Sequence, residues 1–113
     1  MDTAATVDVV TTRDGRVSGM ARQGHVAFLG IPYAKASRFA APEPAPAWSG
    51  VREATKIGLA APQTSHMIAG FAASGPQDED CLNLNVFTPA CDDAKRPVMF
   101  WICLLYTSPS PRD

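Results

Sequence analysis

Apolar and polar residues follow a strand-like pattern with turn signals in the first third of the chain. The β-branched stretch Val7–Thr12 is followed by Asp14-Gly15, a dipeptide typical of two-residue hairpin turns. The pattern predicts a second strand at Arg16–Ala21 and a second turn at Gln23-Gly24. It then predicts a third strand at His25–Leu29. In the third strand, alternate residues point to opposite faces. The pattern therefore predicts antiparallel strands at the start of the chain.

Prolines then interrupt the pattern. Pro32 lacks a backbone donor and biases its predecessor away from helix, so we expect the third strand to end near it. The segment Ala40–Trp48 contains three prolines and predicts an extended chain that brings Trp48 against the core. The following stretch, Val51–Ala54, is compatible with either a short strand or one turn of helix.

Two later segments predict core strands. In Leu82–Phe87, leucine and valine alternate with asparagine and phenylalanine, which is the period of a strand. Val98–Ile102 is continuously apolar, as expected for a strand covered on both faces in an α/β fold. The first 97 residues contain no strongly amphipathic helix pattern, so we expect that cover to come from outside these residues.

Composition narrows the class of protein. The 113 residues are 46% hydrophobic, which argues against disorder, and their formal net charge is −1. No basic patch stands out, so nucleic acid is not an expected partner. No apolar run approaches the roughly 18 residues of a membrane-spanning helix, so we expect no membrane. The start, MDTAATVDVV, lacks the apolar core of a secretory signal, which predicts a cytoplasmic protein.

Candidate chemistry is sparse. The three cysteines, Cys81, Cys91 and Cys103, are too far apart for a zinc motif, and no acid or cysteine lies at ligand spacing from His25 or His66.

The adjacent acids Asp78, Glu79 and Asp80 point in different directions on a strand or turn, so they do not predict a metal or catalytic site. We assign no catalytic, cofactor-binding or metal-ligating residue in these 113 positions.

An ordered series of motifs runs through the chain. It consists of Gly30–Ala34, Arg38-Phe39, Pro42, Trp48–Arg52, Ala54, Ala61–Gln63, Glu79–Pro89 and Arg96–Ile102. In this order and at these spacings, the series closely resembles the amino-terminal segment of the type-B carboxylesterases, which include bacterial para-nitrobenzyl esterases and cholinesterases. The likeness implies an α/β-hydrolase fold. The present chain would supply its amino-terminal antiparallel strands and first core strands, would be mostly β and loop, and would stop before the oxyanion loop.

The resemblance also implies a function for the parent protein. Family members carry a serine in a G-x-S-x-G turn, a glycine-rich loop that binds the oxyanion, and later an acid and a histidine. In the family that loop follows the strand matched by Val98–Ile102, where this chain has Cys103-Leu104-Leu105. No G-x-S-x-G occurs in the sequence. We therefore expect the parent protein to be a serine carboxylic ester hydrolase that acts on small esters through an acyl-serine intermediate and uses no cofactor. We expect the present chain to be catalytically incomplete.

The segment Cys103–Asp113 differs in character from what precedes it. Its eleven residues match, in one frame, the translation of the transposon-end adapter used in sequencing libraries, whose first base would complete the codon of Ile102. A natural Ser/Pro-rich tail would require a chance match of the whole segment. We therefore expect residues 1–102 to form the amino-terminal part of the domain and residues 103–113 to lie outside the fold.

Two further expectations come from the resemblance. In the family, the acid at the position of Glu79 pairs with the arginine at the position of Arg38, so we expect a structural ion pair between them. Cys81 matches a cysteine that forms a disulfide in many secreted relatives, but no cysteine occurs at its partner's place. We expect Cys81 to be a buried free thiol in a reducing compartment.

Two other functions remain open from the sequence. One is a non-catalytic esterase-like relative that serves binding or adhesion. The other is a small β-rich interaction module that covers its apolar strand by oligomerising. The sequence leaves the oligomeric state and the acyl and alcohol preference of the parent undetermined.

Overall fold

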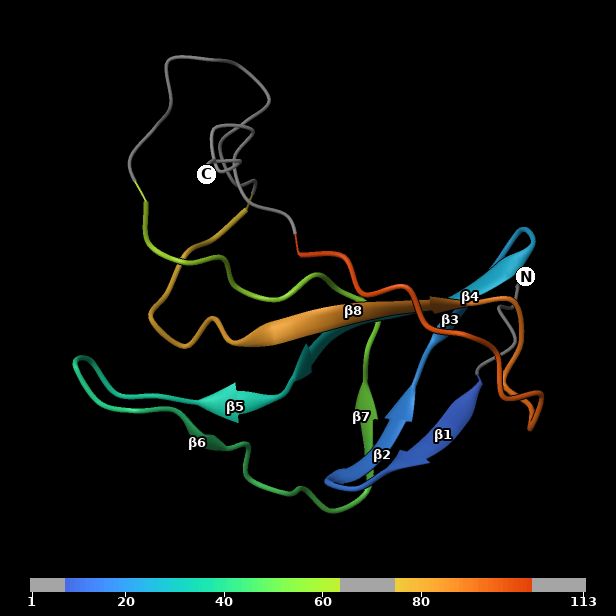
Figure 1. Cartoon of the computed structure of the whole chain (residues 1–113), viewed down its shortest axis with the longest axis horizontal. Coiled ribbons are helices and arrows are strands. Elements are labelled where there is room, and N and C mark those ends of the chain that lie inside the picture. Colours follow the sequence, from blue (N-terminus) through green and yellow to red (C-terminus); the bar gives the residue numbers. More distant parts are fainter. Residues whose placement is uncertain (1–7, 64–74, 103–113) are drawn as a thin grey trace, which may run out of the picture.

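The computed structural model describes residues 8–63 and 75–102, which form three small β-sheets and contain no helix (Figure 1). In the first sheet the order is β1-β2-β7, formed by Val9–Thr12, Gly15–Ser18 and Val51–Glu53. In the second it is β3-β4-β8, formed by Met20–Arg22, His25–Pro32 and Asn83–Thr88. A two-stranded ribbon joins β5 (Ala34–Lys35) to β6 (Glu43–Pro44).

The first hairpin is confirmed, but its turn lies one residue earlier than predicted. Thr12 pairs with Gly15, so the two turn residues are Arg13 and Asp14, and Gly15 begins β2. The hydroxyl of Thr12 donates to the carbonyl of Gly15 at 2.7 Å and closes the turn. Gly15 has a φ of 150°, and a Cβ at this position would lie 2.5 Å from the indole nitrogen of Trp48. Only glycine fits under that ring without displacing it.

The predicted second strand, Arg16–Ala21, is divided at Gly19. Its first half is β2 in one sheet, and its second half is β3 in the other. A Cβ on Gly19 would lie 2.7 Å from the Phe28 ring, so the backbone passes directly over that ring. The turn at Gln23-Gly24 then joins β3 to β4 as predicted, since Arg22 pairs with His25.

Strand β4 is longer than predicted and carries the core. It continues past Leu29 to Pro32 through a β-bulge between Phe28 and Ile31. Val26 and Phe28 are buried against Val17 of β2 and Ala54, and these four residues form the hydrophobic core cluster. The core therefore lies between the two three-stranded sheets.

The proline-rich segment brings Trp48 against this core, as predicted. The indole of Trp48 packs on the core cluster and donates a 2.8 Å hydrogen bond to the carbonyl of Arg16. The guanidinium of Arg52 lies 5.3 Å from the centre of the same ring. Val51–Glu53 pairs in parallel with β2, so this stretch is a strand and not a helical turn.

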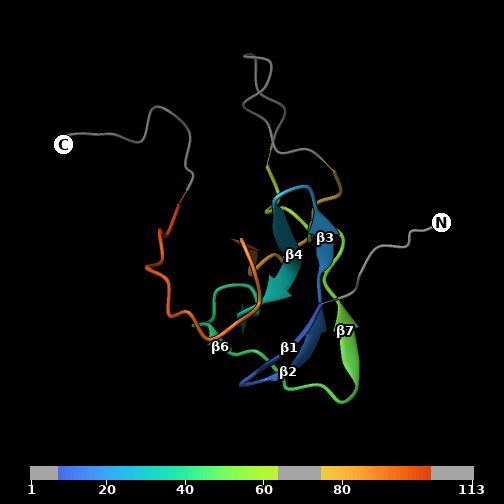
Figure 2. The same ribbon diagram turned by 90° about the vertical axis from the view of Figure 1, so that its right-hand side faces the viewer.

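The predicted strand at Leu82–Phe87 is confirmed as β8, which pairs with β4. The predicted strand at Val98–Ile102 is wrong for this chain, because these residues have no strand geometry and their side chains are 75–88% exposed. Within the described residues, no strand pairs with this segment. Figure 2 shows the segment running apart from the labelled strands. We call Val98–Ile102 the apolar arm.

The position of Gly15 gives a test of the packing. Gly15→Ala should push the indole of Trp48 away and break its hydrogen bond to Arg16, at a cost of about 1–3 kcal/mol. Gly24→Ala is the matched control, because Gly24 also has a positive φ but would bring its Cβ within 4 Å of no other atom. Urea unfolding in a Trp101→Phe background isolates Trp48 emission. Equal midpoints and equal emission for the two variants would contradict the packing argument.

Candidate functional site

Arg38 and Glu79 lie in contact, although 41 residues separate them in sequence. Arg38 follows β5, and Glu79 precedes β8. The Arg38 Nε donates to Glu79 Oε1 at 3.1 Å, and Nη2 of the same guanidinium contacts the other carboxylate oxygen. The bidentate pair ties the loop after β5 to the segment that leads into β8.

This pair is exposed to solvent. The side chains of Arg38 and Glu79 are 67% and 48% exposed, so water screens the attraction. The hydrogen bond from Arg38 is the main cause that lowers the pKa of the Glu79 carboxyl, while the neighbouring Asp78 acts in the opposite direction. The pair positions two loops and provides no buried charge for catalysis.

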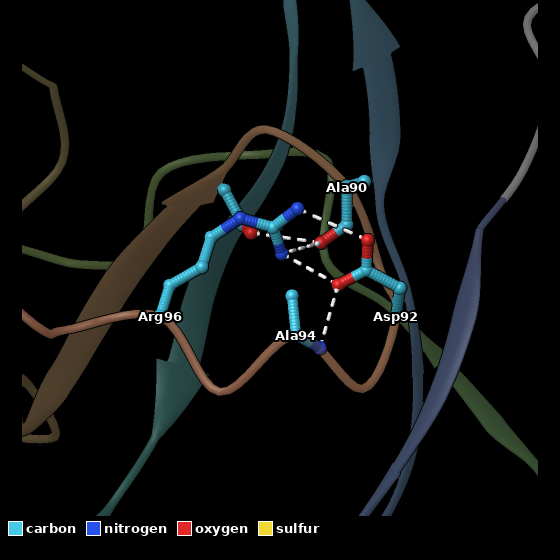
Figure 3. Close-up of polar contacts among 5 residues, drawn as sticks. Ala90, Asp92, Ala94 and Arg96 are labelled. Atoms are coloured by element: carbon cyan, nitrogen blue, oxygen red, sulfur yellow. Dashed lines mark hydrogen bonds and ion pairs between the residues drawn. The ribbon is translucent and has the colours of Figure 1, made fainter.

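A second ion pair shapes the loop after β8 (Figure 3). Arg96 donates from Nη1 and Nη2 to the two oxygens of Asp92 at 2.6 and 3.0 Å. The backbone N–H of Ala94 donates to the same carboxylate at 3.1 Å, and the Ala90 carbonyl accepts from Thr88 at 2.9 Å. These bonds close the loop immediately before Pro97 and the apolar arm. We call this group the Asp92–Arg96 clasp.

Two asparagines of β8 have roles that the sequence reasoning missed. Asn85 Oδ1 accepts from the N–H of Gly30, which lies in the bulge of β4. The amide of Asn83 donates to the carbonyl of Leu59 at 3.1 Å. Asparagine at alternate positions of an otherwise apolar strand is the signal that could have pointed to side-chain bonds along one side of β8.

An open pocket of about 260 Å³ lies between the end of β4 and the segment before β7. It is lined by Pro32, Ala34, Lys35, Pro46, Ala47, Trp48, Arg52 and Asp80. The lining contains two cations and one carboxylate but no serine, cysteine or histidine. This set of side chains offers no nucleophile for acyl transfer.

The described cysteines are both free thiols. Cys81 is only half-buried, so the expected full burial is not observed, and Cys91 is exposed. The pKa of the Cys91 thiol is raised, mainly because the thiol is slightly buried and to a smaller extent because the carboxylates of Asp8 and Asp92 are nearby. A raised pKa lowers the thiolate fraction and does not favour a reactive cysteine.

The remaining candidates do not form a site in the described ranges. The ring of His25 contacts Phe87 edge to face, and His66 lies outside the described residues. Residues 8–63 and 75–102 contain no group of three or more metal-ligating side chains. No helix among them is long and apolar enough to cross a membrane.

Comparison with known proteins identifies the family. Residues 6–103 match the model of the carboxylesterase family. The chain belongs to this carboxylesterase family. Its para-nitrobenzyl esterase relative from Bacillus subtilis (strain 168) is 41% identical in an alignment of length 102, which covers 86% of this chain and 21% of that protein. The phenmedipham hydrolase of Pseudarthrobacter oxydans is 38% identical, over 83% of this chain and 21% of that protein.

Solved carboxylesterase structures contain the same fold segment. An esterase of Clostridium hathewayi superposes on this chain with a TM-score of 0.76 and 39% sequence identity. The superposition covers 88% of this chain and 22% of the esterase chain. A Geobacillus stearothermophilus carboxylesterase has a TM-score of 0.73 at 48% identity, over 83% of this chain and 19% of its own. The chain therefore has the strand-rich amino-terminal part of the α/β-hydrolase fold and spans about a fifth of the length of these relatives.

The Arg38–Glu79 pair gives a test by double-mutant cycle. Arg38→Met and Glu79→Gln should each lower stability at neutral pH, and the double variant should lose less than their sum. Folding lowers the pKa of the Glu79 carboxyl. The stability that ionised Glu79 contributes is therefore fully present above the ordinary carboxyl pKa and is lost as the pH falls through the lowered pKa of the folded state. Urea unfolding between neutral and acid pH measures both effects. Additive losses, or a loss independent of pH, would exclude coupling.

The Asp92–Arg96 clasp gives a graded test. Asp92→Asn keeps an acceptor for the N–H of Ala94 but loses the charge, whereas Asp92→Ala loses both. Amide hydrogen exchange at Ala94 should accelerate most in Asp92→Ala and less in Asp92→Asn. Asp93→Ala is the matched control, because no hydrogen bond from Asp93 contributes to this clasp. Identical exchange in all variants would show that the clasp does not order the loop.

Proposed function

We propose that the complete protein is a serine carboxylic ester hydrolase and that residues 1–102 are the amino-terminal part of its catalytic domain. The observation that carries the proposal is the match of residues 6–103 to the carboxylesterase family, supported by a TM-score of 0.76 to a solved esterase. Both comparisons place the similarity over the same large share of this chain.

The proposed reaction uses groups that this chain does not contain. A serine Oγ attacks the ester carbonyl, the alkoxide leaves as the alcohol after a histidine protonates it, and water then releases the acid from the acyl-serine. The 113 residues contain no G-x-S-x-G sequence. We infer from this that the 113 residues alone are catalytically incomplete.

The role of this segment is structural. Its core joins two sheets, and its ion pairs fix the loops that lead into β8 and into the apolar arm. The substrate of the complete enzyme is a small carboxylic ester, and no cofactor takes part in the reaction. Aryl and benzyl esters are the first substrates to test, because the relatives include a para-nitrobenzyl esterase.

We also propose a cytoplasmic location. Cys81 and Cys91 are both free in the structure, which is usual for proteins of a reducing compartment.

The test is to read the source DNA through the codon of Ile102 by a method without transposon adapters and to assay the complete protein. A G-x-S-x-G turn should follow downstream, and the protein should hydrolyse para-nitrobenzyl acetate. Serine→Ala at that turn should lower kcat by about 10⁴-fold or more. The 113-residue chain is the control and should show no hydrolysis above buffer. A complete protein that lacks the turn or the activity would contradict the proposal.

A further inference from the structure

We propose that the Asp14-Gly15 junction, in the turn between β1 and β2, is a latent site of spontaneous succinimide and isoaspartate formation that Trp48 keeps closed in the folded chain. The inference goes beyond the proposed function, because the reaction takes place in this chain's own backbone and needs no ester. It is carried by the order of the two residues, by the weak hold on the Asp14 carboxylate and by the firm hold on the peptide that follows it.

The fold requires a glycine directly after this aspartate. The turn residues are Arg13 and Asp14, and neither has a positive φ. The backbone reaches positive φ at Gly15 instead, where a Cβ would also lie 2.5 Å from the indole of Trp48. Asp14-Gly15 is the one Asp-Gly junction in the 113 residues, which contain no Asn-Gly. The contact with Trp48 therefore preserves the junction at which a following side chain hinders the backbone nitrogen least.

The reaction needs the two residues and water. The backbone nitrogen of Gly15 attacks Cγ of the protonated Asp14 carboxyl, so an N–Cγ bond forms, the nitrogen loses its proton and one carboxyl oxygen leaves as water. Water then adds to the former main-chain carbonyl carbon of Asp14, and the bond from that carbon to the nitrogen breaks. The product is isoaspartate, in which the main chain runs through Cβ and Cγ. No oxidant or other co-reactant takes part.

The Asp14 carboxylate is held weakly. Its Oδ1 lies 3.5 Å from Nε of Arg13, which is longer than an ordinary hydrogen bond. The Arg13 side chain is 83% exposed, so water screens the attraction. The carboxyl group can therefore turn toward Gly15 without losing a strong partner.

The peptide between Asp14 and Gly15 is held firmly. The Asp14 carbonyl accepts from the backbone N–H of Trp48 at 2.9 Å, and the indole of Trp48 donates to the Arg16 carbonyl at 2.8 Å. On the other side of the turn, the N–H of Asp14 donates to the Thr12 hydroxyl at 3.2 Å. Trp48 thus bonds to the carbonyls on both sides of Gly15.

These contacts restrain the ring closure. The peptide unit is planar, so a rotation that brings the Gly15 nitrogen toward Cγ of Asp14 also moves the Asp14 carbonyl. That movement breaks its bond from Trp48. The closure rate should therefore follow the fraction of time for which Trp48 is undocked, as expected for a reaction that requires local opening. Isoaspartate, once formed, adds one carbon to the main chain and displaces the carbonyl that Trp48 binds.

The experiment incubates the 113-residue chain at slightly acidic pH, in buffer and in urea, and measures isoaspartate at each aspartate by peptide mapping. Product should accumulate faster at residue 14 than at Asp8 or Asp93, which precede valine and alanine. The rate at residue 14 should be about tenfold higher or more in urea than in buffer. Asp14→Glu is the matched control, because it keeps the charge but would have to close a larger ring, and it should give no product at this position.

The role of Trp48 is tested separately from global unfolding. Trp48→Ala should accelerate product formation in buffer toward the rate in urea. Val26→Ala, a core substitution in β4 of the other sheet, is the matched control. The two variants are compared at urea concentrations that give them the same unfolded fraction. At that fraction Trp48→Ala should react about threefold faster or more, because it also opens the turn locally.

Several results would overturn the inference. Absence of isoaspartate at residue 14 in urea would show that the junction is unreactive. Equal rates in buffer and in urea would show that the fold does not restrain the closure. Equal rates for Trp48→Ala and Val26→Ala at the same unfolded fraction would assign the restraint to global folding and not to Trp48.

Discussion

The fold depends on one apolar contact between two sheets. Val17 of β2 and Ala54 after β7 pack against Val26 and Phe28 of β4. Backbone hydrogen bonds run through the same junction, since the N–H of Ala54 donates to Ser18 and the N–H of Leu29 donates to Ala54. Each sheet has only three strands, and a sheet of this size needs a hydrophobic face to be stable in water. Together they enclose a small core, and removing Phe28 from it would expose both inner faces.

The glycines and Trp48 follow from this contact. Gly19 lets the backbone cross the ring of Phe28, and Gly15 lets β2 pass beneath the indole of Trp48. Larger residues at either position would separate the two sheets or displace the ring that covers their edge. The ion pairs lie outside this arrangement. Arg38–Glu79 and Asp92–Arg96 are solvent-exposed, so they set loop geometry more than they set global stability.

The sequence predicted those features that depend on neighbouring residues. The strands β1, β4 and β8, the turn at Gln23-Gly24 and the packing of Trp48 on the core all follow from local patterns. It did not predict the division at Gly19 or the bulge in β4, because both are set by contacts with residues distant in sequence. The bond from Gly30 to Asn85 spans 55 residues and has the same cause. The Arg38–Glu79 contact was anticipated only from the family resemblance, since nothing local links these two residues.

The apolar arm shows a second limit of prediction from local sequence patterns. Its composition predicts a buried strand, yet in this chain it is exposed and unpaired. A run of apolar side chains indicates that a segment is stable when both of its faces are covered. A strand also requires neighbouring strands that pair with its backbone N–H and C=O groups. Burial of each such side chain contributes about 1.5–3 kcal/mol, which is gained only when covering elements arrive. The pattern of the arm therefore describes surroundings that Val98–Ile102 do not have among the described residues.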